Sequence, residues 1–133
     1  MTYNELYTGY FAQTKKYILA GYLPVSVAGK TPDFFKGDRW VDFAPRKELF
    51  LRWKNGELSD IEYGREYLRY LDTIPSEDIE EVRDLTKEAK IVMCCYEKPE
   101  DFCHRKYLAL FLTKKYGFKV SEVEGEEISL WHT

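Results

Sequence analysis

Residues 91–105 read IVMCCYEKPEDFCHR and contain all three cysteines of the chain and one of its two histidines. The run from Ile91 to Cys95 is wholly apolar, which predicts a β-strand buried on both faces. Downstream, Leu108, Phe111 and Leu112 recur at the spacing of one helix face, so we expect a helix that packs against the sheet. The segment therefore predicts a strand and a helix joined by a turn that is rich in ionisable groups.

The turn before this helix has the composition of an anion site. We expect Asp101 to cap the helix, which places Cys103, His104 and Arg105 in its first turn. Backbone N–H groups and the positive end of the helix dipole favour anions and thiolates at such a terminus. An anionic ligand is therefore the partner that this junction predicts.

The motif of this segment also resembles a known family. Cys-Tyr-Glu-Lys at 95–98, Cys-His-Arg at 103–105 and the helix that follows are similar to the C-terminal signature of the domain of unknown function 488 family. Residues 7–11, 25–28 and 43–45 and the tyrosine-rich helix around Tyr63 and Tyr67 resemble the same family, so the likeness covers nearly the whole chain. The resemblance implies a fold and a site at the Cys-His-Arg turn. It implies no reaction, because the name of the family states that its activity is not established.

Length and composition narrow the class of protein. A chain of 133 residues predicts one domain, residues 1–133. Charged residues at 32% and hydrophobic residues at 44% are ordinary for a soluble globular protein, whereas 17% aromatic residues, with eleven tyrosines, is high. The net charge of -3 and the acidic isoelectric point do not favour a nucleic-acid partner, which needs clustered Lys and Arg.

The start of the chain and its cysteines predict a compartment. No basic segment followed by an apolar core opens the chain, and no apolar run reaches membrane-spanning length, so we expect a cytoplasmic protein with no membrane segment. A disulfide between Cys95 and Cys103 is geometrically feasible but disfavoured in a reducing cytoplasm. No metal site is expected, because adjacent cysteines on a strand point to opposite faces. Neither a cofactor nor an oligomeric state follows from the sequence.

Strand and helix patterns alternate along the rest of the chain. We expect strands at 6–11, 24–28 and 118–123, helices at 13–20 and 46–54, a helix opened by the capping box of Ser59 and Glu62, and a helix opened by Pro75 and Ser76. The last of these should turn Ile79, Val82, Leu85 and Ala89 inward. In the irregular stretch 29–45, Phe34, Phe35 and Trp40 are expected to cover a cleft. The predicted fold is a three-layer α/β domain with a small, mainly parallel sheet of about four strands and helices on both faces.

Parallel sheets of this kind bind ligands at the carboxyl ends of their strands. The candidate site residues are Gly9 and Tyr10 after the first strand, Ser26 and Lys30 after the second, and Tyr96, Glu97, Cys103, His104 and Arg105 around the turn. Because these strand ends meet at one edge of the sheet, we expect the residues to converge there.

Each residue of the turn has a possible chemical role. Arg105 suits two-pronged binding of a phosphate or carboxylate, and His104 suits proton transfer near neutral pH. Glu97 can orient His104 or act as a base, and Cys103 is the candidate nucleophile because its position favours the thiolate. The sequence therefore predicts that the chain binds or acts on a phosphorylated small molecule or a nucleotide.

Structural interpretations stand beside these roles. Arg105 and Glu97 can form an ion pair that only ties the turn to the helix. Cys95 is expected to be a small core residue. A phosphatase-type site at Cys95 is not favoured, because such sites have one tight loop before the arginine and nine residues separate Cys95 from Arg105. The alternative function is a non-catalytic module that binds protein or single-stranded nucleic acid through exposed aromatic side chains.

Overall fold

The structure is a computed structural model that describes residues 5–96 and 104–123. Its elements follow in the order β1 (Glu5–Tyr10), the 3-10 turn η1 (Phe11–Gln13), α1 (Thr14–Leu19), β2 (Tyr22–Ser26), the 3-10 turn η2 (Val41–Phe43), α2 (Lys47–Lys54), α3 (Asp60–Leu71), α4 (Ser76–Leu85), β3 (Lys90–Cys95), α5 (His104–Tyr116) and β4 (Lys119–Glu122). Among these helices, none is both long enough and apolar enough to cross a membrane.

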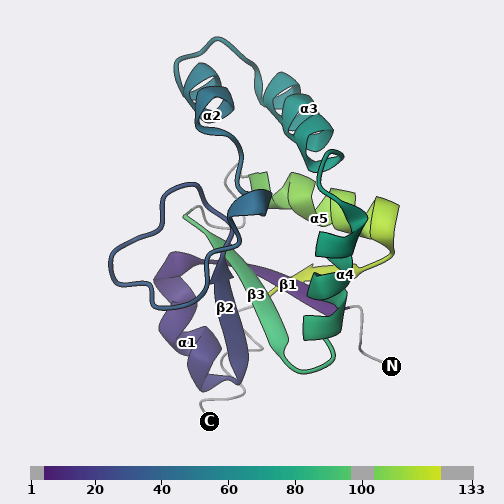
Figure 1. Ribbon diagram of the computed structural model, residues 1–133. Coiled ribbons are helices and arrows are strands. Elements are labelled where there is room, and N and C mark those ends of the chain that lie inside the picture. The colour runs from purple at the N-terminus through teal and green to yellow at the C-terminus, as the bar shows by residue number, and fades with distance from the viewer. Residues whose placement is uncertain (1–4, 97–103, 124–133) are drawn as a thin grey trace.

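The four strands form one sheet in the order β2-β3-β1-β4, and every neighbouring pair is parallel. Helix α1 covers one face of this sheet, and α3, α4 and α5 lie on the other (Figure 1). This architecture confirms the predicted three-layer α/β fold with a parallel sheet. Two crossover connections use helices on opposite faces of the sheet, since β1 reaches β2 by way of α1 and β3 reaches β4 by way of α5.

Strand β3 lies inside the sheet, and Ile91 to Cys95 are all buried, as the apolar run predicted. The side chains of Ile91 to Cys94 alternate between two hydrophobic cores, and Cys95 belongs to the same core as Cys94. Val92 and Cys94 pack in the core that contains Tyr17 of α1. Ile91 and Met93 pack in the larger core, which contains Leu108 of α5. Two-sided burial of this strand therefore holds the layers together.

The helix boundaries follow local sequence signals. Ser59 Oγ accepts a hydrogen bond from the backbone N–H of Glu62 at 3.1 Å, and Ser59 N–H donates to Glu62 Oε1 at 2.9 Å, so the predicted capping box begins α3. In α4 the prediction was wrong for Leu85. Its side chain is 42% exposed, because α4 ends there and the last turn lies on the rim of the core.

The segment after β2 lies along the end of this edge strand. Ser26 N–H donates to Asp38 O at 2.8 Å, and Trp40 N–H donates to Ser26 O at 2.7 Å. Phe35 packs on Phe11, whereas Phe34 is exposed. Trp40 lines a cavity of about 270 Å³ whose other lining residues include Asp42, Phe43, Asp78 and Glu81.

Candidate functional site

The carboxyl ends of β1 and β3 lie side by side, with Tyr10 paired to Cys95. The two strands are followed by helices on opposite faces, because α1 comes after β1 and α5 comes after β3. Open α/β folds bind their ligands at points where the connections of adjacent parallel strands run to opposite faces. The predicted site therefore lies at a position that the topology itself favours.

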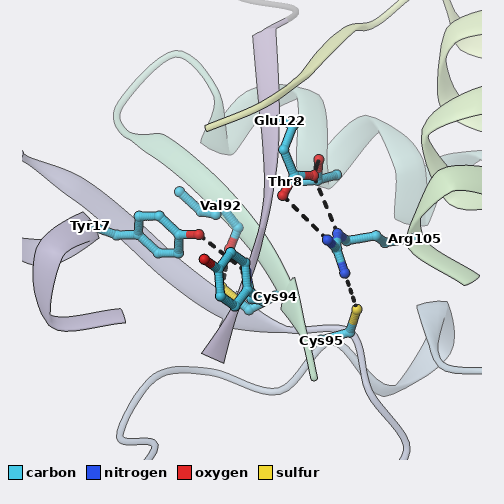
Figure 2. A network of polar contacts seen from close by, with 8 residues as sticks. Thr8, Tyr17, Val92, Cys94, Cys95, Arg105 and Glu122 are labelled. Carbon is cyan, nitrogen blue, oxygen red and sulfur yellow. Dashed lines mark hydrogen bonds and ion pairs between the residues drawn. The ribbon is translucent and has the colours of Figure 1, made fainter. Parts of the chain in front are cut away.

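Arg105 reaches this strand end from the first turn of α5. Its side chain is fully buried, and Nη1 donates to the Sγ of Cys95 at 2.7 Å (Figure 2). The separation of nine residues between Cys95 and Arg105 had argued against a phosphatase-type loop at Cys95. The two side chains meet because α5 begins beside the end of β3 and brings its second residue back to the strand.

Glu122 on β4 holds the other side of the guanidinium. Arg105 Nε and Nη2 each donate to one carboxylate oxygen of Glu122, both at 3.3 Å. Thr8 Oγ1 on β1 donates to Glu122 Oε1 at 2.6 Å, so the contacts run from β1 and β4 through Arg105 to β3 (Figure 2). An internal ion pair neutralises the buried cation. Arg105 is thus not an open clamp for an anion in this structure.

The sequence did not identify Glu122 or Thr8. A structural ion pair had been considered for Arg105, but with Glu97 as its partner, and Glu97 lies outside the described residues. The alternation of side chains along β4 was a sequence signal that could have pointed to Glu122. Val120 and Glu122 share the inward face of β4, while Lys119 and Ser121 are exposed, so a carboxylate stands at a position that an apolar residue usually takes.

The two adjacent cysteines differ in chemistry. Cys94 is a free, fully buried thiol whose Sγ lies 3.7 Å from Val92 O, and burial raises the pKa of this thiol. Cys95 is disulfide-bonded. The expectation that a disulfide at Cys95 is disfavoured is therefore wrong for this structure. Cys103, the predicted nucleophile, is among the residues that are not described.

His104 fastens the start of α5 to the end of β2. Its Nε2 lies 2.7 Å from Val27 O, and its ring packs edge-on against Tyr67. Burial lowers the pKa of His104 from 6.5 to about 4, so the imidazole is neutral at pH 7 and Nε2 must carry a proton to donate to this carbonyl. These contacts favour a positioning role over proton transfer, and the catalytic role of His104 stays a prediction.

Gly9 and Ser26 flank Cys94 in the sheet, one on each neighbouring strand. A Cβ on Gly9 would lie 2.5 Å from the hydroxyl oxygen of Tyr17, so Gly9 faces α1 rather than Arg105. The Ser26 hydroxyl lies 2.7 Å from the Thr31 hydroxyl and accepts from Ala28 N–H at 3.3 Å. Both residues thus have local structural partners.

Tyr10, Tyr96 and Lys30 lie nearer to solvent. Tyr10 Oη accepts from Gln13 Nε2 at 3.2 Å, and Tyr10 N–H donates to Tyr17 Oη at 3.1 Å. Tyr96 is half exposed and packs edge-on against Phe11, while Lys30 is exposed in the segment after β2. Across residues 5–96 and 104–123, no group of three or more His, Cys, Asp or Glu side chains is arranged to hold a metal ion.

A comparison with family models matches residues 18–116 to a model described as the active DUF488-N3 subclade. The matched range contains both Cys95 and Arg105, whereas Thr8 and Glu122 lie outside it. Comparisons with curated proteins and with solved structures returned no match.

Proposed function

The chain belongs to the DUF488 family, and from that premise we propose that it is an enzyme that acts on a phosphorylated small molecule or a nucleotide with Cys95 as its nucleophile. The 2.7 Å contact between Arg105 Nη1 and Cys95 Sγ carries this proposal. A guanidinium beside a cysteine sulfur favours the thiolate over the thiol, and the thiolate is the nucleophilic form.

The surroundings of Cys95 also suit an anionic substrate. The N-terminus of α5 lies next to the sulfur, and its dipole favours negative charge both on a thiolate and on an incoming phosphate. Lys30 is the exposed cation that we assign to the substrate, and Tyr10 and Tyr96 are the rings that we assign to its organic part. Arg105 takes a different role from the predicted clamp, because Glu122 already occupies two of its nitrogens.

The reaction that fits these groups is transfer of a phosphoryl group to sulfur. The Cys95 thiolate attacks phosphorus, the bond from phosphorus to the leaving oxygen breaks, and that oxygen takes a proton from an acid or from water. Water then attacks the phosphocysteine, which releases phosphate and restores the thiolate. Arg105 stabilises the sulfur anion at the start and the end of this cycle.

His104 takes a different role in this proposal from the one that the sequence predicted. His104 positions the first turn of α5 through Val27 O, and it does not exchange protons. Glu97 and Cys103 lie outside the described residues and keep their roles only as sequence predictions. The non-catalytic alternative has less support, since Phe34 and Tyr96 are the only exposed aromatic side chains of the described ranges.

The test uses reduced protein and a panel of phosphomonoesters and nucleotides, with thermal shift as the binding readout and phosphate release as the activity readout. A ligand at 100 times its dissociation constant adds about 2.7 kcal/mol, which raises the melting temperature by several degrees. We expect Cys95→Ser to keep the thermal shift and to lose phosphate release, while Cys94→Ala keeps both. Phosphate release by Cys95→Ser at the rate of the parent protein would contradict the assignment.

A further inference from the structure

We propose that the cavity between the 3-10 turn η2 and helix α4 binds a linear aliphatic diamine in its doubly protonated form. The cavity has a volume of about 270 Å³ and combines an apolar floor, an aromatic wall and a rim with three carboxylates. Sites for drug-sized ligands have volumes of roughly 300–1,000 Å³, so a small ligand is expected here. Neither Cys95 nor Arg105 lines the cavity, and the inference therefore does not depend on the proposed function.

Apolar side chains make the floor of the cavity and part of its rim. Phe43, Ile74 and Val82 are buried members of the larger core, and they form the floor. On the rim, the side chains of Val41 and Leu85 are 57% and 42% exposed. Because burial of apolar surface is favourable, a ligand that covers these two side chains gains free energy. The alkyl chain of a diamine suits this apolar strip.

Three carboxylates line the cavity from two different elements. Asp42 belongs to η2, whereas Asp78 and Glu81 lie one turn apart on the same face of α4. Among the ion pairs in the part of the chain that the structure describes, none involves these carboxylates. Arg39 also lines the cavity, so three carboxylates and one guanidinium give the lining a net charge of -2. A ligand with two positive charges neutralises it.

An organic cation suits these carboxylates better than a metal ion does. Within the described ranges, no group of three or more His, Cys, Asp or Glu side chains is arranged to hold a metal ion, so the three carboxylates do not converge on one point. Ammonium groups need no such convergence, since each one donates its own hydrogen bonds. Two ammonium groups at the ends of one alkyl chain therefore match carboxylates that come from both η2 and α4.

Trp40 provides the aromatic wall of the cavity. Its ring packs edge-on against Phe43, with 5.9 Å between the ring centroids, and its backbone N–H donates to Ser26 O at 2.7 Å. Among the aromatic side chains, Trp attracts cations most strongly. Its place on the wall therefore favours an ammonium group over an uncharged ligand.

The turn that carries Asp42 is fixed before a ligand arrives. Tyr70 Oη donates to Asp42 O at 2.8 Å, and Tyr67 Oη donates to Phe43 O. The backbone N–H of Phe43 donates to Trp40 O at 3.1 Å. Because these bonds hold the turn against α3, binding does not have to order this side of the cavity, which lowers the entropic cost of binding.

A titration followed by proton–nitrogen NMR spectra of the full chain measures both the place and the strength of binding. The probes are 1,4-diaminobutane, 1-aminobutane and 1,4-butanediol at one pH and one ionic strength, so the carbon chain is constant while the charge changes. We expect the diamine to shift the indole N–H of Trp40 and the backbone N–H groups of Asp78 and Glu81. It should bind about fivefold more tightly than the monoamine, and the diol should cause no shift.

Charge-removing variants test the carboxylates. Asp42→Asn/Glu81→Gln keeps the shape of both side chains and removes one charge from each side of the cavity, so binding of the diamine should weaken about tenfold. Glu77→Gln is the matched control, because it removes an exposed charge from the same helix outside the cavity, and it should leave the affinity unchanged. Trp40→Leu keeps an apolar wall and should weaken binding about threefold.

Four results would overturn the site. The first is no binding of the diamine, and the second is equal affinity for the diamine and the monoamine. The third is an equal loss in Glu77→Gln and in the double variant, which would show general attraction to an acidic surface. The fourth is tighter binding of a short peptide with one lysine between two leucines, which would assign the cavity to a partner protein instead of a free diamine.

Discussion

Arg105 Nη1 lies 2.7 Å from Cys95 Sγ, although the two residues are ten positions apart in the sequence. The contact exists because α5 begins at the carboxyl edge of the sheet and returns its first turn to the end of β3. His104, the preceding residue, reaches Val27 O beyond the end of β2. Two consecutive side chains of one helix thus hold the ends of the strands that form the proposed site.

Removal of the Arg105 side chain should destabilise the fold. Arg105→Ala leaves Glu122 and Thr8 without their cation, and breaking a buried ion pair costs about 3–5 kcal/mol. We expect the lower end of this range, because the Glu122 side chain is 23% exposed and water can reach it. Urea unfolding measures the change. Arg69→Ala, which breaks an exposed pair with Glu66, should change stability by less than about 1 kcal/mol, and equal losses in the two variants would contradict the account.

Stability should fall as the pH is lowered through the range in which His104 takes up a proton. The pKa of His104 is about 4 in the folded protein and 6.5 when unperturbed, so the unfolded state binds the proton more tightly. The neutral imidazole makes its full contribution to the free energy of unfolding above about pH 6.5. This contribution, on the order of 3 kcal/mol, is lost by about pH 4. Urea unfolding at a series of pH values should give a flatter curve for His104→Gln than for the parent. Identical slopes would show that His104 is not buried as a neutral group.

Gly9 should not tolerate a side chain. In Gly9→Ala the new Cβ would lie within 2.7 Å of ring atoms of Tyr17, so we expect a loss of about 1–3 kcal/mol in unfolding free energy. Gly29→Ala is the control, because the nearest atom to its new Cβ would be Pro45 O at 3.9 Å, and it should change stability by less than about 0.5 kcal/mol. Thermal unfolding of the two variants measures the difference, and an undisturbed Gly9→Ala would contradict the close contact with α1.

Cys94 should resist modification while the protein is folded. Burial removes the thiol from solvent and raises its pKa, so little thiolate forms at neutral pH. After a short exposure of the reduced, native protein to iodoacetamide, peptide mapping should find Cys94 unmodified. The same treatment in urea should modify it fully, and rapid labelling of native Cys94 would show that β3 is open to solvent.

Local patterns in the sequence predicted most of the fold. The apolar run at Ile91 predicted the two-sided burial of β3, and the Ser59 capping box predicted the start of α3. Contacts between distant strands were not predictable in this way. Glu122 pairs with Arg105 only because β4 lies beside β1, and nothing in the spacing of either residue encodes that register.

Spacing in the sequence did not predict the contact between Cys95 and Arg105. A long loop can still return to its starting point, because each doubling of loop length adds only about 0.6 kcal/mol to the entropy of closure. The separation of Cys95 from Arg105, which argues against a phosphatase-type loop, is therefore compatible with their contact. Arg105 reaches Cys95 because α5 begins beside β3. The position of this helix start depends on how α5 packs against the sheet and not on the length of the turn.

The central claim is that Arg105 stabilises a thiolate at Cys95, and the thiolate content of the reduced protein at neutral pH tests it most directly. Ultraviolet absorbance measures this content, and no reagent has to reach the buried sulfur. An ordinary cysteine is mostly protonated at this pH, and a hydrogen bond from a charged group contributes about 1.5–3 kcal/mol, or roughly tenfold or more in thiolate population. We predict a thiolate signal in the parent that disappears in Cys95→Ser, persists in Cys94→Ala and falls about tenfold in Arg105→Met/Glu122→Gln. No thiolate signal in the parent at neutral pH, or one that survives Cys95→Ser, would contradict the account.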